Sequence, residues 1–150
     1  MKVLLVDDER LALMQLEKML KELGNIEVVG AFLNPAEALA MAGNLQPDVV
    51  FMDIQMPQMD GYKTIAAIRN EKKIDTPVVA MTAFAMPGER KKCITKDMDD
   101  YLSKPLEYNQ LIGILEKFIY LEKEKKKAIK KEMPTESQKA TVKIKRNNKE

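Results

Sequence analysis

The sequence predicts an α/β protein: a flavodoxin-like, doubly wound parallel sheet of five strands in the order 2-1-3-4-5, with five helices. Two observations support this prediction. Short, continuously apolar runs recur through residues 1–120, and amphipathic stretches of about 10–15 residues separate them. Segments that alternate in this way form βαβ units, which build a parallel sheet with helices on both faces.

Local patterns define the elements of the first half. Residues 3–6 form a continuous apolar run, which is typical of a strand buried on both faces. Leucines at helical spacing follow, and Gly24 is suited to end this helix. Residues 26–31 form the second apolar run. Residues 34–37, Asn-Pro-Ala-Glu, combine an N-cap, a first-turn proline and a capping-box glutamate, so a second helix begins there.

The second half repeats the alternation. Its elements are a strand at residues 49–52, a helix at 62–70, a strand at 77–81, a helix at about 88–96, a strand at 100–102 and a helix that begins near 107. Pro57 and Gly61 break the chain between the third strand and the helix that follows it.

The last 30 residues differ from the rest in charge. Residues 1–120 carry 14 Lys and Arg against 18 Asp and Glu, whereas residues 121–150 carry 11 against 5. We predict one globular domain over residues 1–120 and a Lys-rich extension over 121–150. The extension starts as a helix and then becomes disordered, because its apolar residues are too few to bury a core. We expect no nucleic-acid or membrane contact from it, since such tails are more often solvated linkers.

The composition excludes several kinds of chemistry. Cys93 is the only cysteine and histidine is absent, so an internal disulfide, a cysteine or histidine metal site and a Ser-His-Asp triad are all excluded. The apolar runs are shorter than the roughly 18 residues of a membrane span. The first residues contain no signal-peptide core, so we expect a cytoplasmic protein.

Polar side chains stand where four of the predicted strands end. In strand order these residues are Asp7 and Asp8, Asp53, Thr82 and Lys104. Because the carboxyl ends of parallel strands meet at one edge of the sheet, the five side chains should converge there. A single Asp in such a place is often only a cap or a turn residue, but five complementary groups together indicate a site.

The charges in this group predict a metal. Clustered carboxylates repel one another unless a cation intervenes, and oxygen ligands favour Mg²⁺, for which Mn²⁺ can substitute. A carboxylate beside bound Mg²⁺ can act as a nucleophile and form an acyl phosphate. Lys104 would then pair with one phosphoryl oxygen, and Thr82 would donate a hydrogen bond to another.

Four segments resemble the receiver domain of bacterial response regulators, including the chemotaxis regulators. They are residues 5–9 (LVDDE), 52–61 (MDIQMPQMDG), 80–83 (AMTA) and 99–105 (DDYLSKP). The segments occur in the family's order and spacing and cover residues 1 to about 120. One of these motifs alone is weak, but the four together are specific. The resemblance implies the same fold and a role as a phospho-acceptor in two-component signalling or a phosphorelay.

By this resemblance, Asp53 is the phosphorylation site. Asp7, Asp8 and Asp53 hold Mg²⁺, and the backbone carbonyl of Gln55 completes the protein ligands. The phosphodonor implied is a sensor histidine kinase or a histidine phosphotransfer protein.

The resemblance also assigns the residues around the phosphoryl group. Lys104 contacts the phosphoryl group, and its peptide bond to Pro105 is cis. Thr82 is the switch hydroxyl, and the small Ala83 beside it leaves access for the phosphodonor. Tyr101 is the switch aromatic, which turns inward on activation. Phosphorylation would switch the face formed by the fourth helix, fifth strand and fifth helix, and a partner or a second copy of the chain would bind that face.

Two departures from the family pattern stand out. Lys96 and Asp97 occupy positions where such receivers usually have a small residue and glycine, so the end of the fourth helix should be shifted. Phe84 is apolar where many relatives carry a polar residue. We hypothesise that Phe84, together with Gln55, tunes the lifetime of the acyl phosphate by limiting water.

Two other functions compete with a signalling receiver. An aspartate-nucleophile phosphatase would resemble Asp-x-Asp-x-Thr at the nucleophile, but position 55 is Gln, so the general acid is missing. We therefore expect a stoichiometric phospho-acceptor with slow autodephosphorylation and not an enzyme. A phosphorylation-independent binding module usually loses an acidic-pocket residue or the lysine, and this chain keeps them all. The sequence does not distinguish a stand-alone receiver from part of a longer regulator or hybrid kinase.

Overall fold

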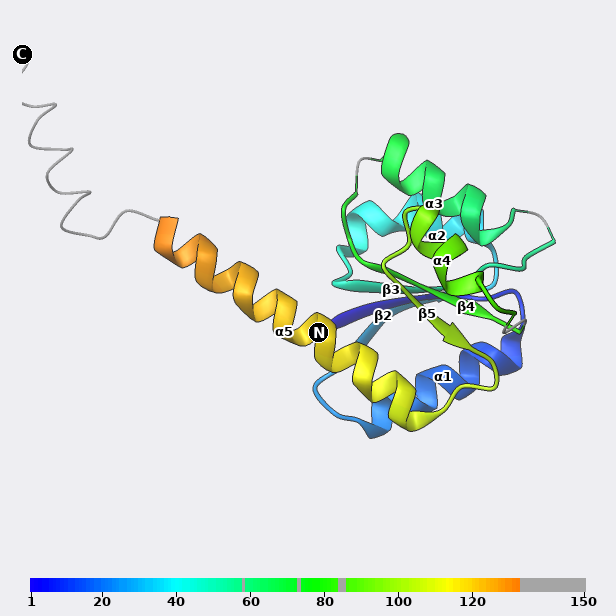
Figure 1. The fold of residues 1–150 in the computed structure, drawn as a ribbon, viewed down its shortest axis with the longest axis horizontal. Helices are drawn as coiled ribbons and strands as arrows, with labels where there is room; N and C mark the ends of the chain where they lie inside the picture. The colour runs from blue at the N-terminus through cyan, green and yellow to red at the C-terminus, as the bar shows by residue number, and fades with distance from the viewer. Residues whose placement is uncertain (58, 73, 84–85, 133–150) are drawn as a thin grey trace, which may run out of the picture. The chain divides into compact units, whose positions relative to one another are not determined.

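The computed structural model describes residues 1–57, 59–72, 74–83 and 86–132. It contains a parallel sheet of five strands in the order β2-β1-β3-β4-β5, which confirms the predicted fold class and strand order (Figure 1). The strands are β1 (Lys2–Val6), β2 (Glu27–Phe32), β3 (Val49–Asp53), β4 (Val78–Thr82) and β5 (Asp100–Ser103). The helices are α1 (Arg10–Glu22), α2 (Pro35–Leu45), α3 (Gly61–Asn70), α4 (Glu89–Thr95) and α5 (Tyr108–Glu132).

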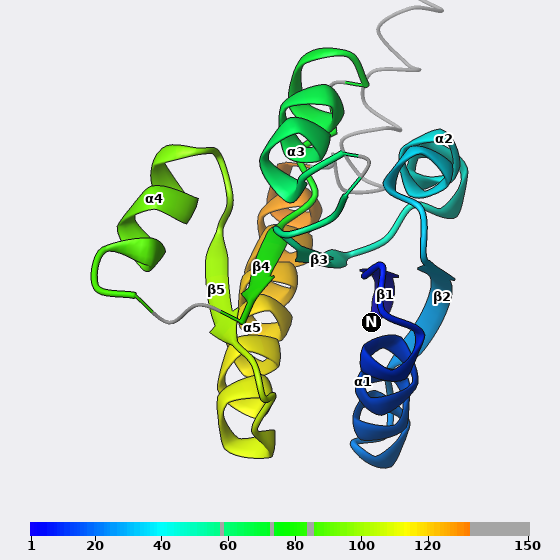
Figure 2. The same cartoon turned by 90° about the vertical axis from the view of Figure 1, so that its right-hand side faces the viewer.

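Helices cover both faces of the sheet (Figures 1 and 2). α1 and the first turns of α5 lie on one face, and α2, α3 and α4 lie on the other. The side chains of alternate residues of β1 pack on opposite faces of the sheet. Val3 and Leu5 belong to the core under α1 and α5, whereas Leu4 and Val6 belong to the core under α2 and α3. This two-residue alternation between two apolar layers explains why the strands read as continuous apolar runs.

Side-chain caps fix the starts of α2 and α3. The Asn34 side chain accepts a hydrogen bond from the Ala36 N–H at 2.8 Å, with Pro35 in the first helical position, as the sequence predicts for α2. Asp60 caps α3 by accepting from the Lys63 N–H at 2.7 Å. Such caps satisfy N–H groups that have no partner inside the helix.

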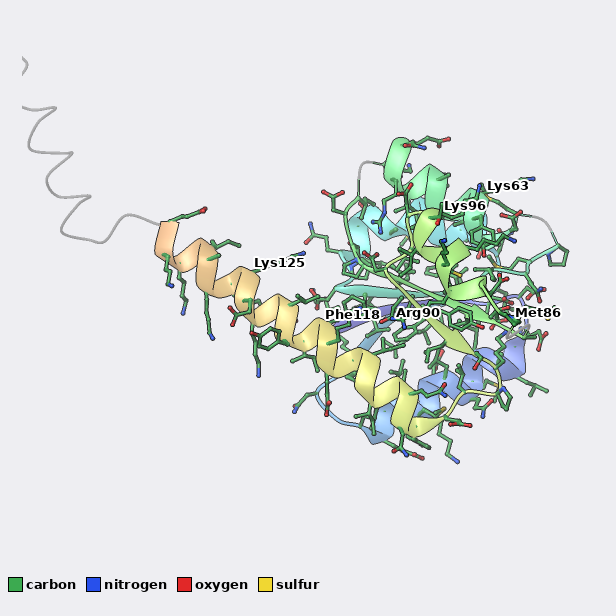
Figure 3. All side chains as sticks on the ribbon, in the orientation of Figure 1. Lys63, Met86, Arg90, Lys96, Phe118 and Lys125 are labelled. Carbon is green, nitrogen blue, oxygen red and sulfur yellow. The ribbon has the colours of Figure 1, made fainter. Side chains whose placement is uncertain are left out.

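Phe118 marks the end of the part of α5 that belongs to the core. Its side chain is buried together with Leu111 and Leu115 of the same helix, and Figure 3 shows it beside the sheet. These residues recur at helical spacing, so one stripe of α5 faces β-strand side chains.

The end of α4 differs from the usual glycine-containing turn. Asp97 adopts a left-handed backbone conformation with φ of 65°. The Arg69 guanidinium donates to the carbonyl oxygens of Ile74 and Thr76, both at 2.7 Å, and to that of Asp97 at 3.3 Å. It also pairs with Asp99 at 3.0 Å. These contacts hold the turn in a conformation that aspartate tolerates less well than glycine, and α4 ends at Thr95.

The chain divides into two compact units, Met1–Phe118 and Ile119–Glu150. In the second unit, Lys126 pairs with Glu122 at 2.6 Å and Lys127 pairs with Glu124 at 3.0 Å, so neighbouring turns of the helix are linked by opposite charges. The disorder expected near the C-terminus concerns residues outside those described. Among the described residues, none of the helices has the length and apolar content that crossing a membrane requires.

Candidate functional site

The carboxyl ends of β1 and β3 bring three aspartates together. Asp7, Asp8 and Asp53 each offer a carboxylate oxygen, and these oxygens lie within 4.8 Å of one another. Asp7 and Asp53 are only 1% and 3% exposed. β1 and β3 are neighbours in the sheet. Along the chain, however, β2 comes between them, and β2 lies at the edge of the sheet. The aspartates therefore lie at the point where the strand order reverses, which is where open α/β sheets bind ligands.

Lys104 reaches into this group from the loop after β5. Its Nζ atom donates to Oδ2 of Asp7 at 2.7 Å and lies 3.4 Å from Oδ2 of Asp53. The Lys104 backbone N–H donates to the carbonyl oxygen of Thr82 at 2.7 Å, which ties the loop to the end of β4. The peptide bond between Lys104 and Pro105 is cis.

Backbone N–H groups orient the two buried carboxylates. The Gln55 N–H donates to Oδ1 of Asp53 at 2.9 Å, and the Glu9 N–H donates to Oδ1 of Asp7 at 2.9 Å. In both aspartates the hydrogen bond holds one oxygen, while Lys104 faces the other. Such local contacts are typical of aspartate directly after a strand.

Burial raises the pKa of Asp53 to about 6. The Gln55 N–H and Lys104 act in the opposite direction, and the negative charges of Asp7 and Asp8 add to the rise. Burial lowers the pKa of Lys104, but the ion pair with Asp7 and the nearby Asp53 outweigh burial, so this pKa lies above its ordinary value. Lys104 therefore stays charged, and Asp53 is ionised at neutral pH.

The three aspartates fit a magnesium ion. Mg²⁺ holds oxygen ligands at about 2.0–2.1 Å, so two oxygens on one ion lie up to about 4.2 Å apart. The carboxylate oxygens lie within 4.8 Å of one another, so small side-chain rotations suffice. A set made only of carboxylates matches the preference of a hard divalent cation. The role of the Gln55 carbonyl as a further ligand stays a prediction.

The other residues expected at the site lie around this group. Thr82 is buried at the end of β4, and Ala83 follows it and is exposed. Tyr101 on β5 is half-buried and packs against the core under α2, α3 and α4. Phe84 lies outside the described residues, so its effect on lifetime stays a hypothesis.

Gly61 contributes to the site in a way that the sequence analysis missed. Its N–H donates to the Ile54 carbonyl at 3.3 Å. A Cβ atom at this position would lie 2.7 Å from both the carbonyl oxygen of Asp53 and Cα of Ile54. Only glycine allows α3 to begin directly against the peptide of Asp53. The sequence did contain one signal for this role: glycine stands at the first position of a helix, where a side chain is usually tolerated.

Asp100 also escaped the sequence analysis. This buried carboxylate on β5 pairs with Lys117 of α5 at 3.0 Å and with Arg90 of α4 at 3.9 Å (Figure 3 labels Arg90). Its Oδ1 atom also accepts from the Tyr101 N–H at 2.8 Å. One carboxylate thus links the three elements of the face that the sequence analysis expects to switch.

Comparison with known proteins agrees with this geometry. The family model described as response regulator receiver domain matches residues 3–116. Among curated proteins, hybrid signal transduction histidine kinase G of Dictyostelium discoideum is 38% identical over 79% of this chain and 4% of its own length. An uncharacterized response regulatory protein of Vibrio cholerae is 36% identical over 77% of this chain and 47% of its own length.

The chain thus spans less than half of these relatives. In contrast, an uncharacterized 14.6 kDa protein of Leptolyngbya boryana is 33% identical over 79% of this chain and 89% of its own length. Sequences similar to this chain therefore occur both within a much longer hybrid histidine kinase and in a short chain of similar size.

Solved structures give the same result. The chemotaxis protein CheY4 of Vibrio cholerae superimposes with a TM-score of 0.69 at 29% identity, over 78% of this chain and 97% of that one. The signal receiver domain of a modulated diguanylate cyclase from Desulfovibrio desulfuricans gives 0.69 at 30% identity, over 83% and 97%. Receiver domains bind Mg²⁺ at an acidic pocket, and this chain has a cluster of three aspartates. The chain belongs to the family of response regulator receiver domains of two-component systems.

Proposed function

We propose that this chain accepts a phosphoryl group on Asp53 from a sensor histidine kinase or a histidine phosphotransfer protein. The single observation that carries the proposal is the position of the Asp53 carboxylate. It is buried, lies 3.4 Å from the Lys104 ammonium and stands within 4.8 Å of two further carboxylates. A structural aspartate would need the lysine alone, whereas a carboxylate that receives a phosphoryl group needs positive charge and additional oxygen ligands around it.

The proposed transfer uses groups of this chain in defined roles. A carboxylate oxygen of Asp53 attacks phosphorus, a new P–O bond forms, and the P–N bond to the donor's histidine breaks. The imidazole leaves as a neutral ring, which keeps the proton that its other nitrogen already carries. The Gln55 N–H holds Oδ1 of Asp53, which leaves Oδ2 on the side of Lys104 for the attack. Lys104 then pairs with a phosphoryl oxygen, and Thr82 donates to another. Mg²⁺ bound by Asp7, Asp8 and Asp53 would neutralise charge on the phosphoryl oxygens.

Apolar residues beside the site support a protein as the donor. Leu11 and Met14 on α1 are 78% and 59% exposed. Leu11 lines a cavity of about 220 Å³ together with, among others, Asp7, Lys104 and Leu106. A phosphohistidine on a helical partner could approach Asp53 while apolar side chains of that partner cover Leu11 and Met14.

The proposed output is a change at the face formed by α4, β5 and α5. Attraction between Thr82 and the phosphoryl group would draw the end of β4 toward Asp53, and Tyr101 would turn inward. Binding of a partner or of a second copy of the chain through this face would report the change. We place these events in the cytoplasm and assign no nucleic-acid or membrane contact to the Lys-rich extension.

The chain is proposed as a stoichiometric acceptor and not a phosphatase. Gln55 stands where an aspartate-nucleophile phosphatase carries its general acid, and an amide cannot protonate a leaving group. Hydrolysis of the acyl phosphate would therefore be slow, and Phe84 with Gln55 would set its rate.

Intact-mass measurement tests the proposal directly. The chain is incubated with Mg²⁺ and acetyl phosphate, and we expect one added phosphoryl group per molecule. EDTA and the substitution Asp53→Asn should each abolish the mass increase. Asp48→Asn is the matched control, because Asp48 lies at the opposite end of the sheet, before β3. Phosphorylation that persists in Asp53→Asn would show that another residue is the acceptor.

A further inference from the structure

A polar contact joins α3 to α4 close to the acceptor site. The Tyr62 hydroxyl on α3 donates to Oε1 of Glu89 on α4 at 3.1 Å. The same hydroxyl oxygen lies 3.6 Å from the Cys93 sulfur, one turn further along α4. The Lys92 ammonium lies 5.1 Å from the centroid of the Tyr62 ring. One tyrosine thus contacts three residues of the first two turns of α4.

The protonation states of these groups suit the contact. Burial raises the pKa of Tyr62, and Cys93 and Glu89 add to the rise, so the hydroxyl keeps its proton and donates it to Glu89. Burial also raises the pKa of the Cys93 thiol. The hydrogen bond between a neutral hydroxyl and a carboxylate is therefore present throughout the neutral pH range.

Both ends of this contact are attached to the acceptor site. Tyr62 directly follows Gly61, whose Cα lies against the backbone of Asp53 and Ile54. Glu89 is the first residue of α4 and lies seven positions after Thr82. The Tyr62–Glu89 hydrogen bond therefore links α3, which begins against the acceptor peptide, to α4, the helix that follows the switch hydroxyl in the chain.

α4 depends on such side-chain contacts for its position. The helix has seven residues, and Cys93 is the one that is buried. A helix this short has little stability of its own. On the β5 side, the contact of Arg90 with Asp100 is long, at 3.9 Å, and Arg90 is mostly exposed. The Tyr62 hydroxyl makes the shorter, half-buried contact, so it contributes more to the position of the first turn.

We infer that Tyr62 is a positioning residue that holds the first turn of α4 in its resting place and thereby slows phosphorylation of Asp53. The inference rests on the proposed function, because it requires that the first turn of α4 moves away from Tyr62 when the phosphoryl group arrives. The hydrogen bond must then break, and its loss opposes the phosphorylated conformation.

Tyr62→Phe tests the inference, since it removes the hydroxyl and keeps the ring under Lys92. We expect acetyl phosphate to label this variant roughly three- to tenfold faster than the parent chain, the range that one hydrogen bond supports. Glu89→Ala should give the same increase, and the double variant should be no faster than either single one. Glu89→Gln, which keeps an acceptor oxygen, should stay close to the parent rate.

Tyr108→Phe is the matched control. The Tyr108 hydroxyl also donates to a glutamate, Glu22 of α1, but on the opposite face of the sheet. Its loss should leave the rate of labelling unchanged. Additive effects in the Tyr62→Phe/Glu89→Ala double variant, or a Tyr62→Phe rate within twofold of the parent rate, would overturn the inference.

Hydrogen exchange separates this inference from the proposed function. Without phosphodonor, Tyr62→Phe should speed amide exchange in peptides covering residues 86–96 and leave β3 unchanged. Unchanged exchange at α4 shows that Tyr62 does not hold the helix, whatever the labelling result. If the parent chain is never labelled, the proposed function is wrong, and so is the effect of Tyr62 on phosphorylation. Faster amide exchange in Tyr62→Phe would still establish that Tyr62 holds α4.

Discussion

Lys104 and Asp7 form a 2.7 Å ion pair between side chains that are 97 residues apart. This distance is shorter than the 3.4 Å from Lys104 to Asp53. In the unphosphorylated chain, the lysine therefore mainly neutralises one of the carboxylates expected to bind the metal. Arrival of Mg²⁺ would neutralise Asp7 in its place, and Lys104 would become available to a phosphoryl oxygen.

Lys104→Met should lower the stability of the metal-free chain and raise its affinity for Mg²⁺. The side chain of Lys104 is 18% exposed, so removing its charge leaves three aspartates close together without a lysine. We expect a loss of about 2–3 kcal/mol in the free energy of unfolding at pH 7 in EDTA. Mg²⁺ should restore more stability in this variant than in the parent chain, as urea unfolding would measure. Lys63→Met, at an exposed position of α3, is the control and should change neither quantity.

Asp53→Asn should stabilise the chain in a pH-dependent way. The folded-state pKa of about 6 exceeds the value of 3.8 for an unperturbed aspartate, so the folded state binds the proton more tightly. The ionised side chain therefore destabilises the fold progressively as pH rises from about 4 to above 6. At pH 7 in EDTA, the variant should be more stable by about 3 kcal/mol, and the difference should shrink toward pH 4. A difference that grows on acidification would contradict the assignment.

Gly61→Ala should damage the site through the backbone. The added methyl group would lie 2.7 Å from the carbonyl oxygen of Asp53, so α3 or the acceptor peptide must shift. We expect a loss of about 1–3 kcal/mol in unfolding free energy and slower labelling by acetyl phosphate. Gly43→Ala in α2 is the matched control, because nothing lies within 4 Å of its added methyl group. That substitution should stabilise the chain by about 0.5–1 kcal/mol.

Asp97→Gly should relieve the left-handed turn after α4. With φ of 65°, Asp97 adopts a conformation that glycine reaches without steric cost. We expect a gain of about 0.5–1 kcal/mol in unfolding free energy, measured by urea denaturation. The rate of labelling should stay the same, since the turn lies at the end of α4 far from Thr82 in the chain. A loss of stability would show that the Asp97 side chain makes a contribution beyond its backbone.

Leu11→Asp should separate the two kinds of phosphodonor. Acetyl phosphate needs only the pocket, so its labelling rate should stay within about twofold. Transfer from a phosphorylated histidine phosphotransfer protein that labels the parent chain should slow by roughly tenfold or more, since a charge would be placed in the apolar contact. Leu121→Asp, at an exposed leucine of the second unit, is the control. Equal slowing with both donors would point to damage in the pocket instead.

Local patterns in the chain were enough to establish the fold and the members of the acidic group. Apolar runs such as residues 49–52 are local, and their alternation with amphipathic stretches is visible without coordinates. The strand order then requires Asp7 and Asp53 to meet, because β1 and β3 are neighbours in a doubly wound sheet. The family resemblance, confirmed by the comparison over residues 3–116, added the expected roles. Those roles remain predictions for each residue.

The contacts between individual side chains, by contrast, could be learned only from the folded chain. The tighter pairing of Lys104 with Asp7, the close approach of Gly61 to Asp53 and the hydrogen bond from Tyr62 to Glu89 have no local pattern in the chain. Periodicity reports which face of an element is buried, and it is a property of neighbouring residues. A contact between two elements also depends on how far each is shifted and rotated against the other, which the packing of the whole core sets.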